Sequence, residues 1–219
     1  MENLNLSQFY YLLAVNPKRK VSSFNIEKRI CFVAGALIEL KLLNCVSIEN
    51  KKVSIIGELP EKNNYLKPLY EYIKEKETVK VDKLATDYLC SFTDKKTNEL
   101  IELIGKSLKE LGIAHEEQVG VLSKSNVYVT ENETIKQAIN KIKSELLENE
   151  DITEENAVIY MLLEKSKLLK EYFSKFELKE LKEKMKNIIK NENYKTIKVI
   201  KEVTDYIEDV VVTLMVAAT

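Results

Sequence analysis

Positive charge and one aromatic ring lie close together early in the sequence. The string Lys18-Arg19-Lys20-Val-Ser-Ser-Phe24-Asn-Ile-Glu-Lys28-Arg29 holds five cations, and its two arginines are the only ones in the chain. Ammonium and guanidinium groups bind phosphate oxygens, and guanidinium does so through two parallel hydrogen bonds. These residue types at this spacing predict a site for a phosphorylated, anionic headgroup, formed by Lys18, Arg19, Lys20, Phe24, Lys28 and Arg29.

The same string fits a membrane surface. Each Lys or Arg near an anionic bilayer contributes about 1 kcal/mol to binding, and an aromatic ring such as Phe24 can enter the headgroup boundary. A structural alternative stays open. In a chain with 32% charged residues, basic loops arise by chance, and an apolar residue beside a helix start often packs back onto that helix.

Residues suited to catalysis are sparse. The single histidine, His115, lies in the polar run Ala-His-Glu-Glu-Gln, which predicts an exposed loop and forms neither a Ser-His-Asp arrangement nor an HExxH metal motif. The five glycines are scattered and form no phosphate-binding loop. We therefore expect no enzyme activity, no catalytic residues, no metal and no cofactor.

The composition is that of a protein with one hydrophobic core. The chain has 219 residues, 45% of them hydrophobic, with 5 glycines and 3 prolines, which excludes a disordered chain and a collagen-like repeat. This length fits a single domain over residues 1–219. The formal charge of −1 provides no global field that would attract nucleic acid, so we expect no nucleic-acid partner.

Cysteine use and hydropathy bear on location. Cys31, Cys45 and Cys90 lie in apolar surroundings, which predicts buried, reduced thiols. The first residues lack a signal-peptide pattern, and the longest uncharged stretch, residues 210–219, is shorter than a membrane span. We expect a cytoplasmic protein that meets a bilayer only peripherally, at the inner membrane surface.

Helical periodicity dominates the chain. Gly35 with Ala34 predicts a close helix crossing, and residues 60–64 predict a linker. Alternating residues predict β-hairpins at 45–56 and 119–130. The sequence thus predicts a mainly α fold, a single globular helical domain with two β-hairpins. Apolar residues three and four apart predict helices over residues 4–13, 23–42, 65–76, 81–92, from a cap at Asp94 or Thr97 to 111, 135–142, 151–169, 176–189 and 194–218.

Four strings share the order seen in one known family. They are Leu4-Asn-Leu-Ser-Gln-Phe-Tyr-Tyr-Leu-Leu-Ala, Gly35-Ala-Leu-Ile-Glu-Leu-Lys-Leu-Leu-Asn before an alternating strand, Leu108-Lys-Glu-Leu-Gly-Ile before a second hairpin, and Asp209-Val-Val-Val-Thr-Leu-Met-Val-Ala-Ala. Together they resemble the Golgi phosphoprotein 3 family over nearly the whole chain. An excess of Lys, Ile, Asn and Glu indicates a prokaryotic member.

The resemblance implies a mostly helical domain that binds phosphatidylinositol 4-phosphate at a membrane surface, without catalysis. It also implies that short peptide tails of membrane proteins are partners, and that copies associate through the hairpin at 119–130. The family's lipid site combines one aromatic residue, placed here at Phe24 or Asn25, with three arginines. Those three positions fall on Val33 and near Asn98 and Ile101. The lysines that could restore the positive charge are Lys95, Lys96, Lys106 and Lys109.

Three functional hypotheses follow. The leading one is a non-enzymatic peripheral membrane adaptor that binds an anionic phospholipid or phosphoinositide headgroup. The second is a winged-helix unit, helix 26–43 with hairpin 46–56, that contacts DNA or another protein; only Asn25, Lys28 and Arg29 suit DNA contact. The third is a protein-interaction module that has the same fold and no lipid contact.

Overall fold

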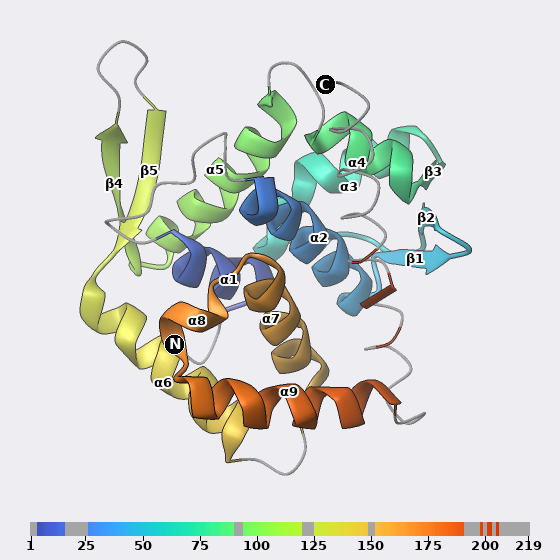
Figure 1. Cartoon of the computed structure of the whole chain (residues 1–219). Helices are drawn as coiled ribbons and strands as arrows, with labels where there is room; N and C mark the ends of the chain where they lie inside the picture. The colour runs from blue at the N-terminus through green and yellow to red at the C-terminus, as the bar shows by residue number, and fades with distance from the viewer. Residues whose placement is uncertain are drawn as a thin grey trace, which may run out of the picture.

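The protein is built mainly from α-helices, so the predicted fold class is confirmed (Figure 1). A computed structural model describes residues 4–15, 26–89, 94–119, 125–148, 152–190, 198, 201–202 and 205. Within these residues the elements are α1 (Leu6–Ala14), α2 (Ile26–Leu42), β1 (Val46–Glu49), β2 (Lys52–Ile55), the 3-10 helix η1 (Glu61–Leu66), α3 (Lys67–Glu75), β3 (Thr78–Lys80), α4 (Val81–Leu89), α5 (Lys95–Glu110), β4 (Ala114–Val119), β5 (Ser125–Thr130), α6 (Asn132–Leu147), α7 (Glu154–Lys165), α8 (Leu169–Tyr172) and α9 (Lys175–Lys190).

Helix α2 lies at the centre of the molecule. Every residue from Lys28 to Leu40 is buried, because α1, α4, α5 and α7 pack around this helix. At Gly35 an added Cβ would lie 3.2 Å from Cδ1 of Leu162 in α7, so the glycine lets the two helices approach closely. The close crossing predicted at Gly35 is confirmed.

Two small antiparallel sheets lie on opposite sides of the helices (Figure 1). In the first, β1 and β2 form the predicted hairpin, with Val46 opposite Ile55. Strand β3 adds a third strand, with Val79 opposite Val53. The sequence does not predict β3 because a strand of three residues is too short to show a period of two.

The second hairpin begins earlier than its predicted first residue, 119. Strand β4 starts at Ala114 and pairs with β5, and His115 lies opposite Val129. The expectation that His115 lies in a loop is wrong, although its side chain is 59% exposed. Four consecutive polar residues of β4, His115 to Gln118, are exposed, so no alternation of apolar residues marks this strand in the sequence.

Three other expectations change along the chain. The linker predicted at 60–64 is the start of η1, and its Asn63 is buried. The helix predicted over 151–169 is two helices, because Lys167 has φ of 63° and breaks the helical path between α7 and α8. The helix predicted over 194–218 lies largely outside the described residues, as does Cys90, whereas Cys31 and Cys45 are buried free thiols.

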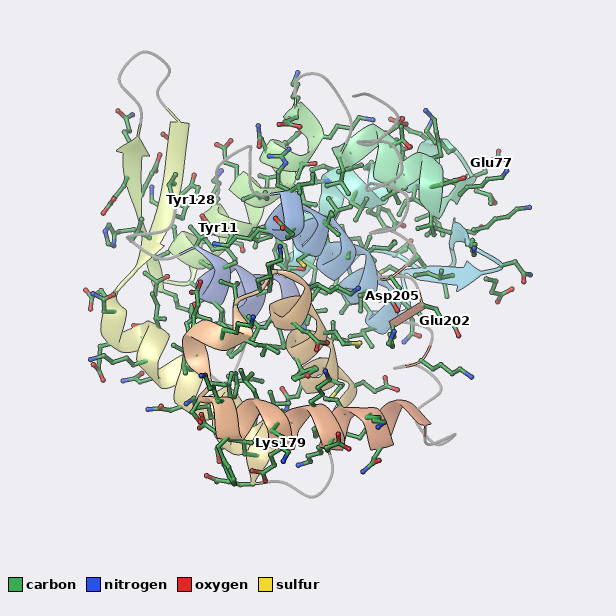
Figure 2. The ribbon with its side chains drawn as sticks, in the orientation of Figure 1. Tyr11, Glu77, Tyr128, Lys179, Glu202 and Asp205 are labelled. Carbon is green, nitrogen blue, oxygen red and sulfur yellow. The ribbon has the colours of Figure 1, made fainter. Side chains whose placement is uncertain are left out.

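The buried apolar residues form one hydrophobic cluster that extends from α1 to α9. At one edge of it the second hairpin packs on α1 and α5, where the Tyr11 hydroxyl accepts a hydrogen bond of 3.2 Å from the Tyr128 N–H. Figure 2 shows these two tyrosines beside each other. The single domain over residues 1–219 stays a prediction.

The same turn follows α2 and α5, and each leads into a hairpin. Asn44 and Gly112 hold the left-handed position of this turn, with φ of 56° and 72°. Two helix–hairpin units with the same backbone geometry therefore occur in a chain whose sequence shows no internal repeat. The matching N–H to C=O bonds are Leu43 to Glu39, Asn44 to Lys41 and Cys45 to Leu40 in the first turn, and Leu111 to Ser107, Gly112 to Lys109 and Ile113 to Leu108 in the second.

Candidate functional site

The first turn of α2 meets the start of α5 through a buried arginine. Arg29 donates to Oδ1 of Asn98 at 2.8 Å, and its guanidinium lies 3.1 Å from Oδ1 of Asp94. The Arg29 side chain is 2% exposed and that of Asp94 is 28% exposed. Burial lowers the pKa of Arg29 and the Asp94 carboxylate opposes this shift. We call Lys28, Arg29, Asp94 and Asn98 the α2–α5 corner.

Lys28, the neighbour of Arg29, binds the end of another helix. Its ammonium donates a 2.9 Å hydrogen bond to the carbonyl oxygen of Ala14, the last residue of α1. A cation at a helix C-terminus satisfies a carbonyl without a helical partner and complements the helix dipole. Lys28 therefore ties the start of α2 to the end of α1.

The structure places two of the six predicted headgroup ligands. Lys28 and Arg29 are both buried and both bind other parts of the chain, so in the structure they position α1, α2 and α5. The other four, Lys18, Arg19, Lys20 and Phe24, lie outside the described residues. The role of all six as direct headgroup ligands stays a prediction.

The positions that match the family's arginines differ in their surroundings. Val33 is fully buried in α2, and Ile101 packs partly buried against the core. Asn98 is exposed and accepts the hydrogen bond from Arg29. The guanidinium of Arg29 thus reaches Asn98. Arg29 lies on α2, one helical turn before Val33.

The four lysines of α5 point toward different parts of the molecule. Lys96 lies over the ring of Tyr72, 4.3 Å from its centroid. Lys109 pairs with Glu116 of β4 at 2.5 Å, and Lys106 lines a small pocket beside η1. Lys96, Lys106 and Lys109 therefore do not form one basic face with the α2–α5 corner.

The burial of α2 bears on the winged-helix hypothesis. A helix that enters a DNA groove must present side chains to base edges. Residues Lys28 to Leu40 of α2 are buried within the protein, and the base-reaching candidates Lys28 and Arg29 are held by Ala14, Asp94 and Asn98. This geometry argues against α2 as a DNA-recognition helix.

A buried carboxylate that the sequence did not single out lies on the same helix. Glu39 accepts hydrogen bonds from the Ser7 N–H at 2.7 Å, from Nδ2 of Asn63 at 3.1 Å and from the Tyr65 hydroxyl at 2.5 Å. Desolvation raises its pKa, and these donors oppose the shift. Because Ser7 lies in the first turn of α1, Glu39 and Lys28 bind opposite ends of the same helix.

The comparison with known families decides the identity of the fold. A family model described as Golgi phosphoprotein 3 (GPP34) matches residues 6–210. This chain belongs to the Golgi phosphoprotein 3 family. The resemblance found in the sequence is therefore confirmed, and a comparison with curated proteins finds no match.

The structure explains the residues of the Gly35-to-Asn44 string, which is one of the strings that resemble the family. Gly35 allows the crossing with α7, Glu39 binds the start of α1, and Asn44 turns the chain into β1. Within the described part of the chain, no helix has the length and apolar content that crossing a bilayer requires.

Proposed function

We propose that this member of the Golgi phosphoprotein 3 family is a non-enzymatic peripheral membrane protein that binds an anionic phospholipid headgroup beside the α2–α5 corner. Lys18, Arg19 and Lys20 supply the positive charge and Phe24 supplies the apolar contact with the bilayer. The observation that carries the proposal is the contact of Arg29 with Asp94 and Asn98, because it holds the first turn of α2, the helix that follows these four residues in the sequence, against the start of α5.

The helices on either side of residues 16–25 support the proposal. Lys28 binds the carbonyl oxygen of Ala14 at 2.9 Å, so the end of α1 and the start of α2, between which the sequence carries Lys18, Arg19 and Lys20, lie close together. Asp94 occupies the N-cap of α5, and its side chain accepts no hydrogen bond from the helix N–H groups. Those N–H groups and the helix dipole favour a phosphate at this end of α5.

Vesicle binding tests which headgroup the protein recognises, because Val33, Asn98 and Ile101 replace the family's arginines. The test uses three kinds of vesicle: phosphatidylcholine alone, phosphatidylcholine with phosphatidylglycerol, and phosphatidylcholine with phosphatidylinositol 4-phosphate. Stronger binding to the phosphoinositide than to phosphatidylglycerol at equal vesicle charge would show recognition of that headgroup. Equal binding would show a general anionic surface contact.

The test uses co-sedimentation with these vesicles at low salt. The double variant Arg19→Gln/Lys20→Gln should bind about thirtyfold more weakly, since each cation near an anionic surface contributes about 1 kcal/mol. The matched control is Lys52→Gln/Lys80→Gln, which removes two exposed cations from β2 and β3. Absence of wild-type binding to every anionic vesicle would overturn the proposal.

The adaptor role and self-association belong to the same proposal and rest on family membership. The partners are short peptide tails of membrane proteins and a second copy of this chain, joined through the hairpin now placed at 114–130. Sedimentation velocity of a variant without residues 120–124 tests the second partner. A concentration-dependent dimer that persists in this variant would exclude the hairpin tip as the contact.

A further inference from the structure

A pocket opens between α7, α8 and α9, on elements that the α2–α5 corner does not use. Its volume of about 360 Å³ is that of a small-molecule site. Leu169 and Leu178 give it apolar walls. The remaining lining residues are Tyr160, Glu164, Lys167, Lys170 and Lys182.

The charges around this pocket do not cancel. Glu164 accepts a hydrogen bond from the Tyr160 hydroxyl at 3.4 Å, and Lys167 pairs with Glu27 at 2.6 Å. Lys170 of α8 and Lys182 of α9 have no ion-pair partner within the part of the chain that the structure describes. Two ammonium groups and two leucines thus border one pocket, which suits a ligand with an anionic group and an apolar part.

Lys182 also belongs to a row of exposed lysines along α9. Residues 175, 179, 182 and 186 are all lysines, and this spacing places them on one face of a helix. Figure 2 labels one of them, Lys179, on α9. Beside the row, Phe176 is 78% exposed, the most exposed large apolar side chain of the described residues. We call Lys170, Lys175, Phe176, Lys179, Lys182 and Lys186 the α8–α9 surface.

This surface adjoins the region of the proposed headgroup site. The ion pair between Glu27 and Lys167 joins the first turn of α2 to the wall of the pocket. Residue 26 begins α2 directly after the segment 16–25. The first turn of α2 and the pocket therefore lie next to each other in the fold.

We propose that the α7–α9 pocket and the α8–α9 surface form a second contact with an anionic bilayer, in which one phospholipid places its phosphate between Lys170 and Lys182 and its glycerol and first methylenes against Leu169 and Leu178. The row of α9 lysines contacts neighbouring headgroups, and Phe176 enters the interface. The inference shares the anionic bilayer with the proposed function and uses a different set of residues.

A bilayer fits these features better than an acidic polymer does. A phospholipid offers one anionic group joined to apolar chains, which matches a pocket bordered by two lysines and two leucines. An extended polyanion would use the lysine row alone and would leave the leucines of the pocket without a partner. The exposed ring of Phe176 has no role in binding such a polymer by charge.

The test compares three double variants on vesicles of phosphatidylcholine with phosphatidylglycerol. Lys170→Gln/Lys182→Gln should reduce partitioning about thirtyfold, about fivefold for each lysine. Arg19→Gln/Lys20→Gln reports on the proposed headgroup site. Lys52→Gln/Lys80→Gln, on the distant three-stranded sheet, is the matched control and should bind as the wild type does. Lys52, Lys80, Lys170 and Lys182 are all exposed. The first and third variants should therefore unfold at the same temperature as the wild type.

The outcomes separate the two proposals. If Lys170→Gln/Lys182→Gln binds like the control while Arg19→Gln/Lys20→Gln loses affinity, the second contact is wrong and the proposed function stands. If only Lys170→Gln/Lys182→Gln loses affinity, the second contact is supported and the headgroup site proposed beside the α2–α5 corner is wrong. Dihexanoyl phosphatidylglycerol below its micelle concentration should shift the amide resonances of α8 and α9, whereas inorganic phosphate should not. Equal shifts with phosphate would overturn the lipid assignment.

Discussion

Lys28, Arg29 and Glu39 are charged residues in the buried stretch of the central helix α2, and each binds the end of another helix. Lys28 binds the last carbonyl of α1 and Glu39 binds an N–H group in its first turn. The cation meets the negative end of the α1 dipole and the carboxylate meets the positive end, so both contacts are favourable. Arg29 meets the positive end of α5, where Asp94 supplies the compensating charge.

Glu39 should give stability an unusual dependence on pH. Burial raises its folded-state pKa above the ordinary value of 4.5, so just above pH 4.5 the folded protein binds more protons than the unfolded chain. The contribution of Glu39 to the free energy of unfolding therefore falls as pH rises through this window. Glu39→Gln lacks this titration and replaces one acceptor oxygen with an NH2 group, so at least one of the three donors to Glu39 loses its acceptor, which costs about 1–3 kcal/mol at pH 4.5.

Urea unfolding at pH 4.5, 5.5 and 7 checks this prediction. The stability difference between wild type and Glu39→Gln should narrow as the pH rises, and the other carboxylates cancel in that difference. A difference that widens with pH would mean that the three hydrogen-bond donors outweigh desolvation and lower the pKa.

Asp94 should stabilise the protein through the buried guanidinium. Asp94→Asn keeps the shape of the side chain and removes the charge that compensates Arg29, which is 2% exposed. We expect a loss of about 1–3 kcal/mol in urea unfolding, the range for hydrogen bonds to charged groups.

The matched control for Asp94 is Glu133→Gln, which makes the same change of charge. Its partner Lys136 lies 3.6 Å away and is 70% exposed, so the effect should stay within about 0.5 kcal/mol. Equal effects of the two substitutions would show that Arg29 is hydrated and does not depend on Asp94.

At the scale of single residues, the sequence identified the cations and not their partners. Lys28 and Arg29 belong to a basic string, and that pattern is the same for solvated and buried lysines and arginines. Their burial depends on Ala14, Asp94 and Asn98, which are brought to α2 by the packing of α1 and α5. Glu39 carried no signal because a single carboxylate in a charged chain is not distinctive.

At the scale of elements, long periodic helices were predictable and short or polar elements were not. The helices α2, α5 and α9 and the first hairpin follow their apolar patterns. Strand β3 is too short to show a pattern, β4 is polar and exposed, and the break between α7 and α8 depends on the left-handed conformation of Lys167. The two strands are defined by pairing with their neighbours, and the break is a local turn whose left-handed residue is a lysine, a residue type that does not mark such a turn in the sequence.

The junction between α5 and the second hairpin depends on the absence of a side chain at Gly105. An added Cβ would lie 2.6 Å from the Tyr11 hydroxyl and 2.6 Å from Cδ2 of Tyr128. Gly105→Ala should therefore push the hairpin away from α1 and α5 and destabilise the protein by about 1–3 kcal/mol. Hydrogen exchange of the β4 and β5 amides should accelerate more than that of α2.

The control for this junction is Lys106→Ala, the exposed neighbour on α5, which should change stability by less than about 0.5 kcal/mol. Alanine at an unconstrained helix position stabilises by about 1 kcal/mol relative to glycine. A stabilised Gly105→Ala variant would mean that the hairpin does not pack against α5 at this point.

At the scale of the whole molecule, a formal charge of −1 coexists with local basic surfaces. The acidic residues that balance the lysines are spread over the surface, and several form ion pairs such as Lys83 with Asp87. The protein as a whole is therefore not drawn to an anionic bilayer. In the two proposals made above, the attraction comes from the cations at 18–20 and on α8 and α9, which act over about one Debye length.

Membrane binding should consequently weaken with salt while folding does not. The Debye length falls from about 30 Å at 0.01 M to about 8 Å at 0.15 M ionic strength, so the partition coefficient on phosphatidylglycerol vesicles should drop at least about tenfold between these conditions. The unfolding temperature should change by only a few degrees, because exposed ion pairs contribute at most about 1 kcal/mol each. In a variant that carries Arg19→Gln, Lys20→Gln, Lys170→Gln and Lys182→Gln together, the salt dependence should shrink. A partition coefficient that does not change with salt would mean that apolar insertion alone holds the protein on the bilayer, and that neither basic surface takes part.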